Sequence, residues 1–422
     1  MNGFLHRLVS GMVQSEPLWI TDARGETHRF GPAPRDGRTV PHLRIRRPEV
    51  ERALTRDPAL ALGEAYMDGG VEMTSGTIFD LLRVVLRDAG RIGDLHPRLK
   101  ALLRMRGVLY RFADRNGLLR ARANVAHHYD LSSDLYELFL DRDRQYSCAY
   151  FPTPDIGLET AQQLKKRHIA AKLCLDRPDL EVLDIGCGWG GMGRYLAEIG
   201  GAQVTGVTLS EEQHAYATAV SADRGLAGRT DYRLQDYRKL NMSFDRIVSV
   251  GMFEHVGAAG YTTFFGKVAE MLRPDGVMLL HTIGQTGSPT ATNPFIRKYI
   301  FPGGYIPSMS EMLPHIERAG LVVTDVEILR LHYAETLKAW RERFAAHRAE
   351  AEQLYDERFC RMWEFYLAAS EASFRWREQV VFQLQLAHRQ DAVPVTRDYI
   401  AAAETVLAER EAAAGRLPLA GE

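Results

Sequence analysis

Cysteine is scarce in this sequence, and the few cysteines are scattered. The chain of 422 residues contains four of them, and no two form a C-x-x-C pair. This pattern argues against a disulfide framework and against a structural zinc site, and it fits a reducing compartment. We therefore expect a cytoplasmic protein without a metal centre.

Long apolar runs and a strong net charge are missing as well. No stretch approaches the roughly 18 apolar residues of a membrane-spanning helix, and the first residues lack the apolar core of a secretory signal. The formal net charge of -1 excludes a globally basic nucleic-acid-binding protein. We expect the protein to be cytoplasmic or peripheral to a membrane, so a charged partner must be recognised by a local patch.

One basic patch lies in residues 98–122. Eight lysines and arginines alternate there with leucines and aromatic residues, against a single acid, Asp114. A basic amphipathic segment is attracted to anionic lipid headgroups, although a solvated linker helix has the same composition. Nucleic acid is disfavoured, since no recognition motif accompanies the basic residues. We expect this segment to contact an anionic membrane surface and to connect two domains.

The residues before this patch predict a small α+β domain. Helices are expected at 2–14, 48–56, 58–67 and 77–89, with a hairpin over 18–30 and a further strand over 39–47. The apolar face of the first helix suits either packing into a core or lying on a membrane. With its basic connector, this predicted domain spans residues 1–120.

Residues 158–330 alternate between short apolar strands and amphipathic helices, which is typical of a parallel α/β sheet. The expected strands are 181–186, 203–208, 230–235, 244–250, 276–283 and 321–330, and the expected helices are 158–174, 191–200, 211–224, 261–272 and 310–319. In such sheets the ligand binds at the carboxyl ends of the strands. Polar segments follow four strands, at 208–213, 235–238, 251–255 and 281–284, and predict one cleft.

The sequence EVLDIGCGWGG at 181–191 is the centre of this domain. A buried strand runs into a turn with four glycines, and an amphipathic helix follows. Three of the glycines match the G-x-G-x-x-G pattern of dinucleotide sites. Such a site needs an acidic residue at the end of the second strand, where this chain has Thr208. Asp184, at the mouth of the turn, instead suits a ligand with an ammonium or hydroxyl group, such as S-adenosylmethionine (SAM).

The segments after the fifth strand are less specific. Residues 293–307 form a long aromatic loop, which suits a lid over an apolar substrate or simple core packing. Beyond residue 330 the chain reads as helices whose aromatic stripes are typical of a core. The last residues, rich in alanine and glutamate, predict a surface helix with a frayed end.

Several motifs occur in the order found in the cyclopropane-fatty-acyl-phospholipid synthases, a family of class I SAM-dependent methyltransferases. Between about Asn124 and Val381 they are HYDLS, YSCAYF, VLDIGCGWGG, GVTLS, QDYR, FDRIVSVGMFEHVG, LLHTIG and KYIFPGG. The chain resembles the long, phospholipid-acting branch of this family, which also has an N-terminal domain and a basic connector. The resemblance implies a Rossmann-like class I methyltransferase fold with helical additions for residues 121–422.

The family's reaction explains the polar residues of these motifs. The π bond of a cis alkene in a lipid acyl chain attacks the sulfonium methyl of SAM, and loss of a proton from the new methyl closes the ring. The resemblance implies that a bound bicarbonate takes this proton, because a carboxylate aimed at the carbocation could be alkylated. It assigns this site to Cys148, Glu254, His281, Ile283 and Tyr333. Backbone amides, His281 and Tyr333 would hold the anion, and Glu254 would accept its proton or orient His281.

The resemblance also assigns the SAM site. The amino-acid end of SAM would lie at Gly186, Cys187 and Gly188, beside Asp184, with Tyr146 and Ser147 closing over it. The ribose and adenine would contact Thr208, Leu209 and Gln213, and the adenine edge Gln235, Asp236 and Tyr237. The missing acid after the second strand is a feature of this family.

The substrate implied by the resemblance is an unsaturated phospholipid acyl chain, modified by a homodimer at the inner face of the cytoplasmic membrane. Loss of a proton from the neighbouring chain carbon would instead give a methyl- or methylene-branched lipid, as in branched or furan fatty acid pathways. A non-catalytic lipid- or adenosyl-binding protein and a methyltransferase for small soluble acceptors are the alternatives from other classes. The intact Glu254 and His281 favour cyclopropanation.

Overall fold

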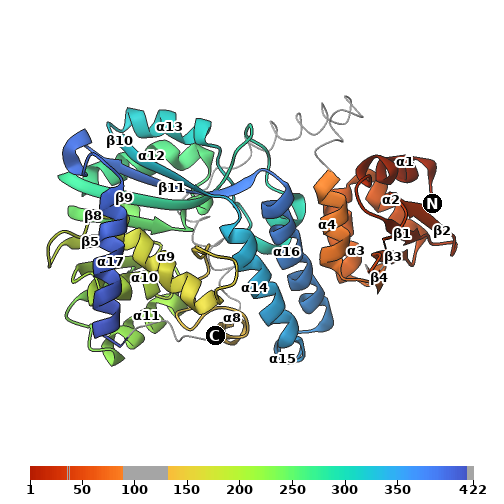
Figure 1. Ribbon diagram of the computed structural model, residues 1–422, viewed down its shortest axis with the longest axis horizontal. Helices are drawn as coiled ribbons and strands as arrows, with labels where there is room; N and C mark the ends of the chain where they lie inside the picture. The colour runs from red at the N-terminus through yellow and green to blue at the C-terminus, as the bar shows by residue number, and fades with distance from the viewer. Residues whose placement is uncertain (36, 38, 89–131, 416–422) are drawn as a thin grey trace. The chain divides into compact units, whose positions relative to one another are not determined.

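The computed structural model describes residues 1–35, 37, 39–88 and 132–415 (Figure 1). The chain forms two compact units, and neither is continuous in sequence. The first unit comprises residues 1–113, 290–302 and 337–379, and the second comprises 114–289, 303–336 and 380–422. Among the helices of the described residues, none is both long and apolar enough to cross a bilayer. The basic patch predicted at 98–122 lies outside the described residues.

The second unit is built on a seven-stranded sheet with the order β10-β11-β9-β8-β5-β6-β7. Its strands are β5 (Glu181–Ile185), β6 (Gln203–Thr208), β7 (Thr230–Leu234), β8 (Phe244–Val250), β9 (Leu272–Gln285), β10 (Val322–Leu329) and β11 (Gln379–Ala387). Strands β5 to β9 are parallel, and β10 pairs with β11 in the antiparallel sense. Because β5 lies between β6 and β8, the strand order reverses there, which creates a crevice at the carboxyl ends of these strands.

Helices cover both faces of this sheet (Figure 1). On one face, α12 (Tyr261–Met271) and α13 (Met309–Arg318) share an apolar core with the strands. On the other face, α9 (Leu158–Lys172), α10 (Gly191–Glu198) and α17 (Asp398–Ala413) form a second core. Helix α11 (Glu211–Asp223) packs on β7 and β6. This is the predicted Rossmann-like class I methyltransferase architecture.

The first unit has a four-stranded sheet of order β2-β1-β3-β4. Its elements are α1 (Gly3–Met12), β1 (Leu18–Thr21), β2 (Thr27–Phe30), β3 (His42–Ile45), α2 (Pro48–Arg56), α3 (Pro58–Met67), β4 (Val71–Ser75), α4 (Ile78–Asp88), the π-helix η5 (Ile296–Ile300), most of α14 (His332–Ala346), α15 (Arg348–Leu354) and α16 (Glu357–Trp376). Helix α16 packs on α3 and α4. The small N-terminal domain therefore shares its core with segments from much later in the chain.

Most predicted elements are confirmed, but four segments differ from the prediction. Strand β4 was not predicted, and β11 falls where only helices were expected. The aromatic loop at 293–307 contains the π-helix η5, and Phe295 and Ile300 are buried, with Phe295 against Phe365. These two side chains thus take the core-packing alternative rather than the lid. The C-terminal helix is less superficial than expected, since Ile400, Leu407 and Glu411 on α17 are buried.

Candidate functional site

The glycine-rich turn after β5 has the backbone geometry that its sequence predicts. Gly186 and Gly190 have φ angles of 80° and 79°, in the left-handed region that favours glycine. A Cβ on Gly186 would lie 2.6 Å from the Cβ of Met252, so a side chain is also excluded by packing. Helix α10 begins directly after the turn, at Gly191. The turn therefore leaves room for a ligand close to the backbone.

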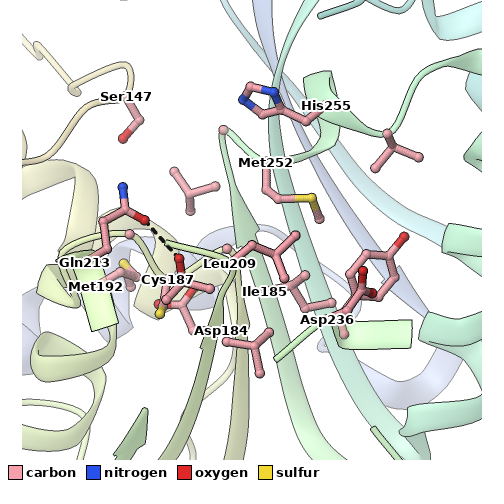
Figure 2. Close-up of a pocket in the computed structure, with 18 of the residues that line it drawn as sticks. Ser147, Asp184, Ile185, Cys187, Met192, Leu209, Gln213, Asp236, Met252 and His255 are labelled. Atoms are coloured by element: carbon pink, nitrogen blue, oxygen red, sulfur yellow. Dashed lines mark hydrogen bonds between the residues drawn. The ribbon is translucent and has the colours of Figure 1, made fainter. Parts of the chain in front are cut away.

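A cavity of about 590 Å³ opens beside this turn, at the carboxyl ends of the sheet strands (Figure 2). All twelve residues predicted to bind SAM line it: Tyr146, Ser147, Asp184, Gly186, Cys187, Gly188, Thr208, Leu209, Gln213, Gln235, Asp236 and Tyr237. The lining also includes residues outside the set predicted to bind SAM, among them Trp189, Met252 and His255. Three of the four predicted strand-end segments, at 208–213, 235–238 and 251–255, thus contribute to one cavity with the glycine turn, whereas no residue of the fourth, at 281–284, lines it.

Asp184 presents a carboxyl oxygen that a ligand in the cavity can pair with. Its Oδ2 atom is buried and has no hydrogen-bond partner among the described residues. Burial raises the pKa of the Asp184 carboxyl to about 7, while the nearby Lys165 ammonium partly opposes this rise. An ammonium or hydroxyl group of a ligand would satisfy the unpaired oxygen. The site therefore fits the amino-acid end of SAM.

Two pairs of polar side chains in the wall of the cavity are already joined by hydrogen bonds. Thr208 Oγ1 donates a hydrogen bond to Gln213 Oε1 over 2.9 Å, as the dashed line in Figure 2 shows. Arg238 binds both carboxylate oxygens of Asp236, with Nη2 at 2.6 Å from Oδ2 and Nε at 2.9 Å from Oδ1. Burial alone would raise the pKa of Asp236, but the hydrogen bonds from Arg238 hold it below its usual range. These pairs fix the side chains before a ligand arrives.

A buried lysine holds the loop that forms one wall of the cavity. Lys165, on α9, donates hydrogen bonds from Nζ to Gln145 Oε1 over 2.7 Å and to Ser147 Oγ over 2.9 Å. Gln162, one turn earlier, donates to the main-chain carbonyls of Gln145 and Ser147. Burial lowers the pKa of Lys165 to about 7, although the Asp141 carboxylate opposes this. Sequence reasoning missed both residues because polar side chains occur all around α9, so nothing in the pattern marks its buried face.

We expect Lys165→Met to weaken SAM binding about tenfold. The change leaves Gln145 Oε1 and Ser147 Oγ without their buried donor, which costs about 1–3 kcal/mol per group, and it loosens the loop against the cavity. Isothermal titration calorimetry with SAM measures the loss. Lys166→Met is the matched control, because the Lys166 ammonium pairs with Asp143 instead. An equal loss of affinity in both variants would refute the role of Lys165.

Three of the five predicted catalytic residues lie together beside the cavity. Glu254 follows β8, and its Oε1 accepts the main-chain N–H of Ile283 over 2.6 Å. His281 is two residues before Ile283 on β9, and it pairs in register with Val250 of β8. Glu254 Oε2 and His281 Nε2 are buried, and neither has a hydrogen-bond partner within the described parts of the chain. An unpaired acceptor and an unpaired ring nitrogen mark a place for a polar ligand.

Burial changes the proton affinity of both groups. It raises the pKa of Glu254 to about 7, while the N–H of Ile283 partly opposes the rise. Burial also lowers the pKa of His281 well below its ordinary value, and the cationic Lys165 and Lys172 lower it further. His281 is therefore a neutral imidazole, and Glu254 changes its protonation state near neutral pH. Such a carboxyl is suited to exchange a proton during turnover.

Cys148 and Tyr333 occupy a neighbouring part of the same unit. The Cys148 thiol is buried, and burial raises its pKa, so it is a neutral thiol rather than a nucleophile. The backbone N–H of Ala149 donates to Thr336 Oγ1 over 3.0 Å, which ties the loop to the start of α14, where Tyr333 lies. The Lys165 ammonium influences the pKa of both the Cys148 thiol and His281. None of the five predicted catalytic residues lines the cavity itself.

The sequence matches a family model described as mycolic acid cyclopropane synthetase over residues 117–384. It is 42% identical to the cyclopropane-fatty-acyl-phospholipid synthase of Escherichia coli over 356 residues, which cover 83% of this chain and 88% of that protein. It is also 37% identical to the tuberculostearic acid methyltransferase of Mycobacterium tuberculosis, with 82% of this chain and 83% of that protein covered.

A solved structure has the same fold and a similar sequence. The mycolic acid cyclopropane synthase CmaA1 complexed with SAH and CTAB superposes with a TM-score of 0.60 at 35% identity, covering 63% of this chain and 97% of that one. Together with the glycine turn, the cavity and the paired Glu254 and Ile283, these similarities settle the class of the protein. The chain belongs to the mycolic acid cyclopropane synthetase family of SAM-dependent methyltransferases.

Proposed function

We propose that this enzyme converts the cis double bond of unsaturated phospholipid acyl chains into a cyclopropane ring, with SAM as the donor of the added carbon. The similarity to the Escherichia coli synthase along most of both chains carries the proposal. The alkene carbon bonds to the sulfonium methyl while the sulfur–carbon bond breaks. Loss of one proton from that methyl then lets its carbon bond to the cationic chain carbon, so the product gains one CH₂.

The buried polar groups beside the cavity support a bicarbonate site. When bound, bicarbonate supplies a base that can take the methyl proton. Such an ion needs donors for its oxygens and an acceptor for its hydroxyl group. The unpaired Oε2 of Glu254 can serve as the acceptor, and the unpaired Nε2 of His281 as a donor. The residues present fit the ion, and we propose that Cys148, Ile283 and Tyr333 complete its surroundings.

A product assay tests this proposal directly. The purified protein is incubated with SAM and vesicles of a cis-monounsaturated phospholipid, and the acyl chains are analysed by gas chromatography and mass spectrometry with and without bromination. We expect a product heavier by one CH₂ that does not take up bromine. No gain of mass on lipid, with turnover of a soluble acceptor, would refute the proposal.

A second candidate function is the synthesis of methyl- or methylene-branched chains. The similarity to the tuberculostearic acid methyltransferase, which covers a comparable share of this chain, favours it. The carbocation would then lose a proton from the adjacent chain carbon rather than from the methyl. The same assay separates the two functions, because a branched olefin of equal mass still takes up bromine.

We also propose that the enzyme works as a homodimer at the cytoplasmic membrane, with residues 1–120 as a lipid-engaging domain and 121–422 as the catalytic domain. Two features of the described N-terminal residues bear on this. Leu5 and Val13 are buried in the first unit, whereas Phe4 on α1 is 48% exposed. The first helix thus buries Leu5 in its unit and leaves the aromatic side chain of Phe4 at the surface.

The basic patch at 98–122 carries the expected attraction to anionic lipid. We expect replacement of Arg104, Arg106, Arg111 and Arg115 by glutamine to weaken binding to anionic vesicles by at least a hundredfold, because each cation near a charged membrane adds about 1 kcal/mol. Sedimentation with vesicles of anionic and of zwitterionic phospholipid measures the effect. Replacement of Arg46, Arg52 and Arg389, which are exposed elsewhere, is the control. If the variant with the four glutamines binds anionic vesicles as tightly as the wild type does, residues 98–122 act only as a linker.

A further inference from the structure

His281 is the end of a buried chain of hydrogen bonds that runs across the sheet. Gln383, on the neighbouring strand β11, has its Nε2 atom 3.2 Å from His281 Nδ1. Its Oε1 atom accepts a hydrogen bond from Lys172 Nζ over 2.8 Å. Lys172 in turn donates to a carboxylate oxygen of Glu327 on β10. Gln383 and Lys172 are both fully buried.

The chemistry of Lys172 fixes which group donates and which accepts in each of these hydrogen bonds. An ammonium group has three donors and no acceptor, so the amide atom that faces Lys172 must be the oxygen of Gln383. The amide nitrogen then faces His281, and it can only donate. Nδ1 of His281 must therefore accept this hydrogen bond. In a neutral imidazole, the single ring proton is then on Nε2.

Two observations make this orientation firm. Burial lowers the pKa of Lys172, but Glu327 binds it directly and Asp325 Oδ2 lies 3.8 Å from its Nζ, and both carboxylates favour the cation. His281 is held neutral, because burial and nearby cations lower its pKa well below the ordinary value. A reversed amide would place two donors against each other at Lys172. Lys172 thus donates to Gln383, and Gln383 donates to His281 Nδ1. The ring proton of His281 is therefore on Nε2.

We infer that Gln383 and Lys172 are positioning residues that keep His281 in the tautomer with its proton on Nε2, so that this nitrogen donates to the anion beside Glu254. The inference rests on the proposed function for its anion. In the other tautomer Nε2 would be an acceptor, which repels an anion instead of holding it. The tautomer decides whether the buried Nε2, which has no partner among the described residues, is a donor or an acceptor toward the anion.

The tautomer can be observed in the intact protein. In full-length enzyme labelled with ¹⁵N-histidine, long-range ¹H–¹⁵N correlation spectra distinguish a protonated from an unprotonated ring nitrogen. The His281 signals are identified by their absence in His281→Asn. For the wild-type protein we expect a protonated Nε2 and an unprotonated Nδ1.

Substitution of Gln383 provides the decisive comparison. Gln383→Glu keeps the shape of the side chain but presents an acceptor to both Lys172 and His281, so the imidazole proton should move to Nδ1. We expect kcat to fall at least tenfold while the Kd for SAM changes less than twofold. Gln383→Met removes the donor without adding a charge and should give a mixture of tautomers. If the glutamate variant does not fold, the methionine variant alone still tests whether Gln383 sets the tautomer of His281.

Gln385→Met is the matched control for these variants. Gln385 is on the same strand and equally buried, but its Nε2 donates to the Lys172 carbonyl and to the Tyr399 hydroxyl. We expect His281 to keep its Nε2 proton in this control, with kcat within twofold of the wild type.

The outcomes separate this inference from the proposed function. A protonated Nδ1 in the wild-type protein, or an unchanged tautomer in both Gln383 variants, would overturn the inference even if the enzyme makes cyclopropane lipids. The expected tautomers in an enzyme that makes no such lipid would support the hydrogen-bond chain and refute the proposed function instead.

Discussion

Glu254→Gln is expected to lower kcat by a factor of about 10²–10⁴, the range for removal of a group that transfers a proton, while the Kd for SAM stays within twofold. The glutamine oxygen can still accept the N–H of Ile283, so the backbone hydrogen bond to Oε1 remains. Its amide NH₂ replaces the unpaired Oε2 and cannot accept a proton. Single-turnover assays of acyl-chain modification, with SAM binding measured by calorimetry, separate the two effects. Equal losses in kcat and in SAM affinity would refute the role of Glu254 in proton transfer.

The same variant should be more stable than the wild-type protein above neutral pH. Burial raises the pKa of Glu254 from 4.5 to about 7 in the folded state, so the native protein keeps a proton that the unfolded chain releases. The free energy of unfolding therefore falls as the pH rises from 4.5 to 7, and the loss persists above that range. Because one pKa unit corresponds to about 1.4 kcal/mol, the buried carboxylate costs the native state about 3 kcal/mol at pH 8.

Urea unfolding at pH 8 and pH 5 checks this second effect. We expect Glu254→Gln to gain stability at pH 8 and to gain little at pH 5, where the native carboxyl is protonated. A variant that is less stable than the wild type at both pH values would show that the Glu254 carboxylate stabilises the fold. Higher stability together with lost turnover is the signature of a group retained for catalysis rather than for folding.

Gly186→Ala should abolish most SAM binding, with an expected loss of at least thirtyfold. A side chain at a φ of 80° costs about 1 kcal/mol, and the new Cβ would also lie 2.6 Å from the Cβ of Met252, which itself lines the cavity. Relief of that contact must move either the glycine turn or Met252, and both moves alter the cavity.

Gly225→Ala is the control for the backbone cost alone. Its φ is 70°, and no atom lies within 4 Å of the position that a Cβ would take. We expect this control to lower the melting temperature slightly and to leave the Kd for SAM unchanged. If Gly186→Ala binds SAM as tightly as Gly225→Ala does, the close packing of the turn has no role in the cofactor site.

The sequence was sufficient to predict six of the seven strands in the sheet of the second unit and twelve of the residues that line its cavity. The central strands β5, β6 and β8 are buried on both faces, so short apolar runs mark them, and glycine and polar residues mark where they end. Strand β11 was missed because the whole region beyond residue 330 was assigned to helices, although the alternation of Gln383 and Gln385 with apolar residues is a strand pattern. Both are buried, and their amides serve hydrogen bonds that only the folded chain assembles.

The buried cations could not be predicted for a related reason. Lys165 and Lys172 look like ordinary surface residues of a helix that has polar side chains all around it, since lysine is almost never fully buried unless it is paired. Their partners come from the loop before α9 and from β10 and β11, at sequence separations that no local pattern records. By contrast, Glu254 and His281 were predicted because each stands in a motif that resembles those of the family, MFEHVG after one strand and LLHTIG at the end of the next.

The position of β11 also has a consequence for synthesis of the chain on the ribosome. Although β11 is the last strand to be made, it lies inside the sheet, between β10 and β9. Until residue 387 has emerged, a nascent chain presents β9 with an open edge, and open edges invite pairing with other chains. The core of the first unit is also completed late, because α3 and α4 pack on α16, which ends at Trp376. Both units are therefore completed nearly together, late in translation, and the N-terminal segment must be kept from aggregating until then.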